Sequence, residues 1–197
     1  DTDIISSTVT ISKATGYVTL GATSGTSTYG TTSKTFTVTG SHGGTLSVSD
    51  DNATATASIS GNTVTISSIG SLYAGTVVKV TVKAAESTNY TAASQTYTLT
   101  IGKASATNPT LTAYNKAYDG SSHTIGVSGG SGGTIKYSTD KTNWSTEKPT
   151  YKDYTNGAKT IYVKVFGDSN HNDTDIISST VTISKATGYV TLGATSG

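Results

Sequence analysis

A string of 25 residues occurs twice in this chain without a single substitution. The letters DTDIISSTVTISKATGYVTLGATSG occupy residues 1–25 and return at residues 173–197, so the period is 172 residues. An identical repeat at a fixed offset is typical of a tandem array in which each repeat is a structural unit. The sequence therefore predicts a window on a longer array, holding one period and the start of the next.

A shorter motif inside the repeat marks the expected domain borders. TISKA stands at 10–14 and again at 182–186, and a close variant, TIGKA, stands at 100–104. We call these three motifs the seams. The intervals between them have the size of one small β-sandwich each, so the period predicts two related domains that are not identical.

The seams set the expected boundaries. They predict a last strand of a preceding second-type domain at 1–13, a first sandwich at 14–103, a second sandwich at 104–186 and the start of the next repeat at 187–197. Because residues 1–12 lack their parent sandwich, we expect them to lie loose or to add to the exposed sheet edge of a neighbour.

Alternation of apolar and polar residues predicts an all-β chain. Thr, Val, Ile and Tyr are frequent, and their side chains favour the pleated sheet. Phe36 and Val38 share one face of a strand, as do Val78, Val80 and Val82, while Thr, Ser and Lys take the opposite face. No segment has helical periodicity. The expected strands are 16–20, 34–39, 45–49, 55–59, 62–67, 77–84 and 93–101, then 110–113, 122–127, 134–139, 150–152, 159–166 and 177–184.

The seams leave almost no residues between the last strand of one domain and the first strand of the next. Short connections restrict a hinge far more than a long Gly/Ser linker does. The sequence therefore predicts two tandem sandwiches in an extended rod.

Composition excludes several classes of function. All 13 basic residues are lysine and the net charge is +1, which argues against nucleic acid as a partner. No apolar run is long enough to cross a bilayer, so we expect no membrane contact by this segment. There is no cysteine, and no Gly-x-Ser-x-Gly elbow lies between a strand and a helix, so we expect no enzyme.

Several motifs together resemble a known family. The segment AYDGSSHTIGVSGGSGGTIKYSTDKTNWS at 117–145, with its Tyr118-Asp119-Gly120 signature and a closing TISKA, resembles the YDG/MBG-like immunoglobulin-like tandem repeats of large bacterial cell-surface proteins. NTVTISSIGSLYAGTVVKVTVKAAESTNYTAAS at 62–94 is similar to the group-2-like repeats. The resemblance implies immunoglobulin-like sandwiches, an extracellular location on a bacterial surface, and a structural stalk or adhesin segment that projects a distal binding region.

The loop DSNHNDTD contains the best candidate for a metal site. Asp168, Asn170 and Asn172 have the 1, 3, 5 spacing of a calcium loop, with Asp173 next to them, and Ca²⁺ takes oxygen ligands. Against calcium, a hairpin turn belongs at this place, and Asp and Asn are common turn residues. Calcium is thus the one cofactor considered; otherwise none is expected.

Aromatic residues of the second domain raise an alternative function. Trp144, Tyr137, Tyr151 and Tyr154 are candidates for a platform that binds host glycan or protein. The competing interpretation places Tyr137 in a core strand and Trp144 at the edge of the sandwich. A third class, a covalently self-linked domain, depends on Gln95, whose counterpart in the second domain is Ile177. The partners expected for the stalk itself are adjacent copies of the same repeat.

Overall fold

The computed structural model describes residues 3, 5–190 and 193 and contains only strands and connections. In this described part, no helix is long and apolar enough to cross a membrane. The chain divides into two compact units, 1–104 and 105–197. The division falls one residue after the border that the middle seam predicts.

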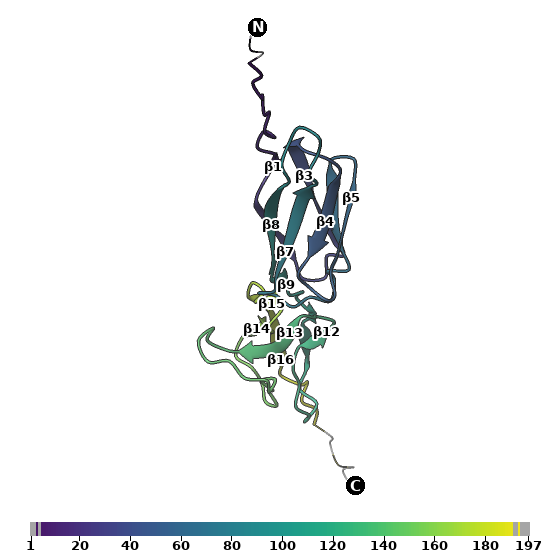
Figure 1. Ribbon diagram of the computed structural model, residues 1–197. Helices are drawn as coiled ribbons and strands as arrows, with labels where there is room; N and C mark the ends of the chain where they lie inside the picture. Colours follow the sequence, from purple (N-terminus) through teal and green to yellow (C-terminus); the bar gives the residue numbers. More distant parts are fainter. Residues whose placement is uncertain (1–2, 4, 191–192, 194–197) are drawn as a thin grey trace. The chain divides into compact units, whose positions relative to one another are not determined.

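The first unit is a sandwich of two four-stranded sheets (Figure 1). One sheet has the order β1-β3-β6-β5 and the other β2-β8-β7-β4. In chain order these are the A-B-E-D and A′-G-F-C sheets of an immunoglobulin-like domain. The strands are β1 (Tyr17–Leu20), β2 (Ser24–Thr28), β3 (Ser33–His42), β4 (Leu46–Asp50), β5 (Thr56–Ser60), β6 (Thr63–Ser67), β7 (Val77–Ala84) and β8 (Ala93–Gly102).

Alternating side chains fill the space between these two sheets. Val78, Val80 and Val82 of β7 are fully buried, and their neighbours along the strand point outward. Phe36 of β3 stacks on Tyr97 of β8 with ring centroids 4.0 Å apart, so the two sheets meet through an aromatic pair. Burial of such side chains contributes roughly 1.5–3 kcal/mol each, and this core is the main source of stability for the unit.

Strand β2 was not expected from the sequence. Its residues, SGTST, lack apolar alternation, and the strand forms because its backbone pairs in parallel with β8. A Cβ atom at Gly25 would lie 2.2 Å from the Tyr97 hydroxyl oxygen, so a larger residue at this position would have to displace the buried Tyr97 ring. Alternation of side chains therefore did not predict β2, because this strand forms through backbone pairing with β8.

The second unit has the same plan with a reduced first sheet. Its main sheet has the order β11-β16-β14-β13, again with one parallel pair, β11 with β16. β10 pairs with β12, and the short strands β9 and β15 pair with each other. The strands are β9 (Ala104–Ser105), β10 (Thr110–Thr112), β11 (Tyr114–Ala117), β12 (Gly126–Ser128), β13 (Gly133–Ser138), β14 (Lys159–Gly167), β15 (His171–Asn172) and β16 (Ile177–Ser184).

Two segments of this unit that the sequence predicts as strands form shorter structures. The segment 122–127 becomes β12 at its end, and 150–152 is reduced to an isolated bridge between His123 and Tyr151. Pro149 lies two residues before Tyr151 and has no N–H group that could extend the ladder in that direction. Both predictions were therefore too long, because a few alternating residues do not form a strand without a partner along their length.

The core of the second unit depends on its last strand. Val181 and Ile183 of β16 and Ile161 and Val163 of β14 are fully buried and form one cluster. β16 lies between two partners, antiparallel to β14 and parallel to β11. This pairing bonds its backbone on both sides and buries alternate side chains.

The two copies of the 25-residue string have different structures. Val181 and Ile183 are fully buried, whereas their equivalents Val9 and Ile11 are 83% and 92% exposed. Residues 5–12 form no strand, and Figure 1 shows them as a trace before β1. Conversely, 17–20 form β1 in the first unit, while their equivalents Tyr189 and Val190 are exposed. Residues 1–2, 4, 191–192 and 194–197 of the two copies lie outside the described residues. Addition of 1–12 to the sheet edge of a neighbour stays a prediction.

This duplication allows a test with its own control. We expect Ile183→Ala to lower the free energy of unfolding of the second unit by about 2–5 kcal/mol, because it leaves a cavity in the core. The same change in the same local sequence, Ile11→Ala, should change stability by less than about 0.5 kcal/mol. Denaturant unfolding followed by far-UV circular dichroism reports on both units and measures both variants, and the fluorescence of the single tryptophan, Trp144, identifies the transition of the second unit. Equal losses in the two variants would contradict the different burial of the two copies.

Candidate functional site

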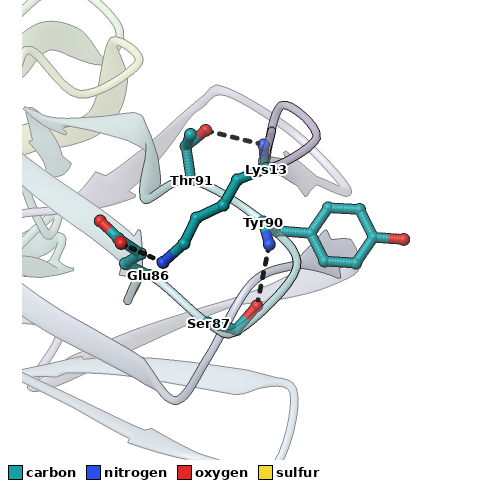
Figure 2. A network of polar contacts seen from close by, with 6 residues as sticks. Lys13, Glu86, Ser87, Tyr90 and Thr91 are labelled. Carbon is teal, nitrogen blue, oxygen red and sulfur yellow. Dashed lines mark hydrogen bonds and ion pairs between the residues drawn. The ribbon is translucent and has the colours of Figure 1, made fainter. Parts of the chain in front are cut away.

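The first seam is bonded to the connection between β7 and β8. The Ala14 N–H donates to the Asn89 carbonyl at 2.8 Å, and the Thr91 N–H donates to the Ala14 carbonyl at 2.9 Å. The Lys13 ammonium group forms an ion pair with Glu86 (Figure 2). The Lys13 ammonium group also donates a hydrogen bond to the Glu86 carboxylate, and this bond and the positive charge of Lys13 hold the pKa of Glu86 below its ordinary value. The seam is thus fixed to the first unit by backbone and side-chain contacts.

A close backbone approach completes this anchor. The Gly16 N–H donates to the Thr91 hydroxyl oxygen at 3.1 Å, and a Cβ atom on Gly16 would lie 2.0 Å from the Thr91 carbonyl oxygen. Only glycine fits in this arrangement. The connection itself is held by Ser87, whose N–H donates to the Tyr90 carbonyl and whose hydroxyl accepts the Tyr90 N–H (Figure 2). We call these contacts of Lys13, Ala14 and Gly16 the seam anchor.

The four residues proposed for calcium lie between β14 and β16. Asp168 accepts the Asn170 N–H at 2.8 Å and lies 2.8 Å from the His171 imidazole, and both contacts lower its pKa, the imidazole more. Asp173 accepts the Gly167 N–H at 2.9 Å and pairs with the Lys164 ammonium group at 2.8 Å. Asn170 is buried and Asn172 belongs to β15. Both carboxylates therefore bind groups of the protein.

No group of three or more His, Cys, Asp or Glu side chains in the described residues is placed to hold a metal ion. The Tyr118-Asp119-Gly120 signature has a different local role. Asp119 accepts the Ser121 N–H and the His123 imidazole, each at 2.8 Å, and both bonds lower its pKa, the imidazole more. The His123 ring stacks on Tyr114 with centroids 4.1 Å apart. The signature thus closes a turn on the second unit.

The four predicted aromatic residues occupy different environments. Tyr137 is buried and faces the core, and Tyr151 packs against the same core. Tyr154 is 48% exposed, with the Lys185 ammonium group 5.2 Å from its ring centroid. Trp144 contacts Phe166, with centroids 5.5 Å apart and ring planes at 69°. Tyr137 and Trp144 thus contact opposite faces of the sheet, because Phe166 points away from the core.

Sequence reasoning missed the residues beside Trp144. Tyr162, Lys164 and Phe166 alternate along β14 with the buried Ile161, Val163 and Val165, so they share the outer face of the sheet. The ammonium groups of Lys136 and Lys164 both lie 4.9 Å from the Phe166 ring centroid, and that of Lys141 lies 4.7 Å from the Tyr162 centroid. We call Lys136, Lys141, Trp144, Tyr162, Lys164 and Phe166 the lysine–aromatic face. The alternation of β14 was the signal that could have identified it.

A tight loop holds Trp144 at the edge of this face. Asp140 accepts the N–H groups of Thr142 and Asn143, each at 2.8 Å, together with the Ser138 hydroxyl. These bonds, those from Asn143 first, hold the pKa of Asp140 well below its ordinary value. Lys141 has a φ of +66°, and its carbonyl accepts the Trp144 indole N–H at 3.1 Å.

Gln95, considered for a covalent cross-link, lies in β8 opposite Val82 and is half-buried. The residue opposite Gln95 on β7 is therefore the apolar Val82, which has no group that could form a cross-link with Gln95.

Comparison with known proteins finds likeness only in structure. No model of a protein family matches the chain, and no curated protein matches it. The titin domains Z1Z2 in complex with telethonin are 15% identical and have a TM-score of 0.49, with 90% of this chain and 100% of that chain covered. Fibronectin(III)-like modules of Clostridium thermocellum CbhA are 13% identical with a TM-score of 0.32, covering 89% of this chain and 100% of theirs. Drosophila N-cadherin EC1-3 is 12% identical with a TM-score of 0.31, covering 88% of this chain and 69% of its own.

The Asp140 loop leads to a prediction about Trp144. We expect Asp140→Ala to shift Trp144 emission to longer wavelength, because two backbone N–H groups lose their acceptor and the loop opens to water. The exposed Asp153→Ala is the matched control and should leave the emission unchanged.

Acidification of the unmodified chain tests the same loop. A carboxyl whose pKa is lowered by folding stabilises the fold above its unfolded pKa, and this contribution disappears as the pH falls through the folded pKa. We therefore expect the native Trp144 emission to persist from neutral pH to below about pH 3.9, the ordinary pKa of Asp. A transition of the loop centred above that pH would contradict the role of Asp140.

Proposed function

We propose that this chain is a structural segment of a repetitive bacterial surface protein, in which alternating domains extend a stalk from the cell envelope. The role is mechanical and needs no catalytic site. Adjacent copies of the same repeat are its direct neighbours in the full-length chain. The segment lies outside the cell, on the bacterial surface.

The observation that carries this proposal is the seam anchor. Strand β16 ends at Ser184, which corresponds to Ser12, and β1 begins at Tyr17. Of the four residues from Lys13 to Gly16, three bond to the first unit. A second-type domain that ends at Ser12 would therefore have almost no slack before the next domain, and a short anchored connection limits bending.

The 25-residue string supports the same proposal. Its copy at 173–197 supplies β16 to the second-type domain, and its copy at 1–25 supplies β1 to the first-type domain. One string thus encodes the end of one domain and the start of the next. A chain that repeats with this period contains the same junction once in every period.

The middle junction is shorter still. β8 ends at Gly102 and β9 begins at Ala104. Both kinds of junction in the proposed array therefore lack a flexible linker, which supports a stalk whose length grows with the number of repeats.

Concatenated repeats test the proposal. Strands of about 8–10 residues at roughly 3.3 Å per residue, together with the turns at their ends, make one domain roughly 30–40 Å long. One period of two domains should therefore add roughly 70–80 Å to the maximum dimension measured by X-ray scattering. A three-period chain should lengthen in proportion to a one-period chain. The control is a three-period chain with about 12 Gly/Ser residues inserted after each TISKA seam, which should be more compact on average because such linkers behave as random coils. A three-period chain without inserts whose radius of gyration is no larger than that of the control would contradict the proposal.

A further inference from the structure

We propose that the lysine–aromatic face of the second unit is a binding site for an acidic polysaccharide, with its anionic groups at Lys136 and Lys164 and a sugar ring against Phe166. This goes beyond a mechanical role, because it gives each second-type domain a ligand of its own.

The first argument is the position of the two lysines. Lys136 of β13 is directly opposite Lys164 of β14 in the antiparallel register, and like charges directly opposite each other destabilise a sheet. Asp173 pairs with Lys164 at 2.8 Å. Among the residues that the structure describes, no carboxylate forms an ion pair with Lys136. The face therefore carries more positive charge than its own carboxylates balance, and an anion bound between the two lysines would remove the repulsion.

The first unit shows that the fold does not require this arrangement. β4 and β7 form the equivalent strand pair there, and their outward residues pair as Lys83 with Ser47 and Thr81 with Ser49. No like charges are opposed at these positions. Because two sandwiches of the same plan differ here, the opposed lysines are a property of the second-type domain and not of the scaffold.

The second argument is the aromatic surface between the charges. Phe166 is half-buried, and the ammonium groups of Lys136 and Lys164 each lie 4.9 Å from its ring centroid. The edge contact with Trp144 and the row of Tyr162 and Phe166 along β14 extend this surface. A pyranose ring presents C–H groups on its flat face, which pack on aromatic rings, and its carboxylate or sulfate groups bind lysine.

The charges favour an acidic polysaccharide over nucleic acid. Affinity for nucleic acid rests on many phosphate contacts and on a strong positive field, whereas this chain has a net charge of +1 and no arginine. Lysine is a compact point charge that suits single carboxylate or sulfate groups. A short row of two or three lysines with aromatic rings between them fits a chain of sugars whose charges are spaced apart.

Binding by the complete 197-residue chain tests the proposal. Calorimetry with three hexasaccharides separates the candidate chemistries: hyaluronan, which carries carboxylates; heparin, which also carries sulfates; and chitohexaose, which is neutral. We expect saturable binding of at least one acidic oligosaccharide, weaker at higher salt because charges are screened, and none of the neutral one. A single-stranded oligothymidylate and an oligoglutamate of equal charge serve as competitors.

Variants locate the site. Lys136→Gln with Lys164→Gln should weaken binding about tenfold or more, since each charged hydrogen bond contributes more than about 1.4 kcal/mol, and Phe166→Leu should also weaken it. The control is Lys79→Gln with Lys83→Gln on the exposed side of β7, which removes the same charge and should leave the affinity unchanged. The Lys136 and Lys164 variant loses the repulsion together with the exposed ion pair between Lys164 and Asp173, so its melting temperature should change little. The melting temperature is measured beside the affinity, which separates lost binding from unfolding.

Three outcomes would overturn the proposal. The first is no saturable binding of either acidic hexasaccharide. The second is equal binding of oligothymidylate or oligoglutamate, which would show attraction by charge alone. The third is a loss of affinity in the Lys79 and Lys83 control equal to that in the Lys136 and Lys164 variant.

Discussion

Both sandwiches depend on pairing their last strand on two sides. β8 lies between β7 and β2, and β16 lies between β14 and β11. A buried strand must bond its backbone N–H and carbonyl groups, and these neighbours provide the partners while Leu99 and Val181 fill the cores. Residues 5–12 carry the same letters as β16 and form no strand. The structure of this string is therefore decided by the strands beside it and not by its own composition.

The same dependence explains how one string can join two domains. The lysine of the seam has two environments: Lys13 pairs with Glu86 of the first unit, whereas the Lys185 ammonium group lies over the ring of Tyr154 in the second. The sequence at the seam is constant, and the domain next to it decides which contacts form. An exposed ion pair adds little to stability, so the backbone bonds of Ala14 and the close approach of Gly16 do most of the anchoring.

Alternation in the sequence predicted the strands that carry the cores. β7, β14 and β16 lie where apolar residues alternate, and β7 and β16 have the predicted bounds. β2 and β11 were missed, since SGTST and YNKA have no apolar alternation and form strands through parallel pairing with the last strand. Trp144 was the only predicted aromatic residue on the lysine–aromatic face. The position of Lys136 opposite Lys164 could not be predicted, because the long connection 139–158 leaves the register open.

The two kinds of domain differ most on the outer face of the same strand pair. In the first unit this face is built from Ser, Thr and Lys without opposed charges, as a solvated sheet requires. In the second, the same place carries Lys136 opposite Lys164 and half-buried aromatic rings, with both ammonium groups over the ring of Phe166. The opposed lysines are therefore not needed for the shared plan of the two sandwiches, and the binding role that we propose accounts for them. In an array of the proposed kind such a face would recur once per period, so a weak single contact with a long acidic polysaccharide would be strengthened by linkage, without any change to the face itself.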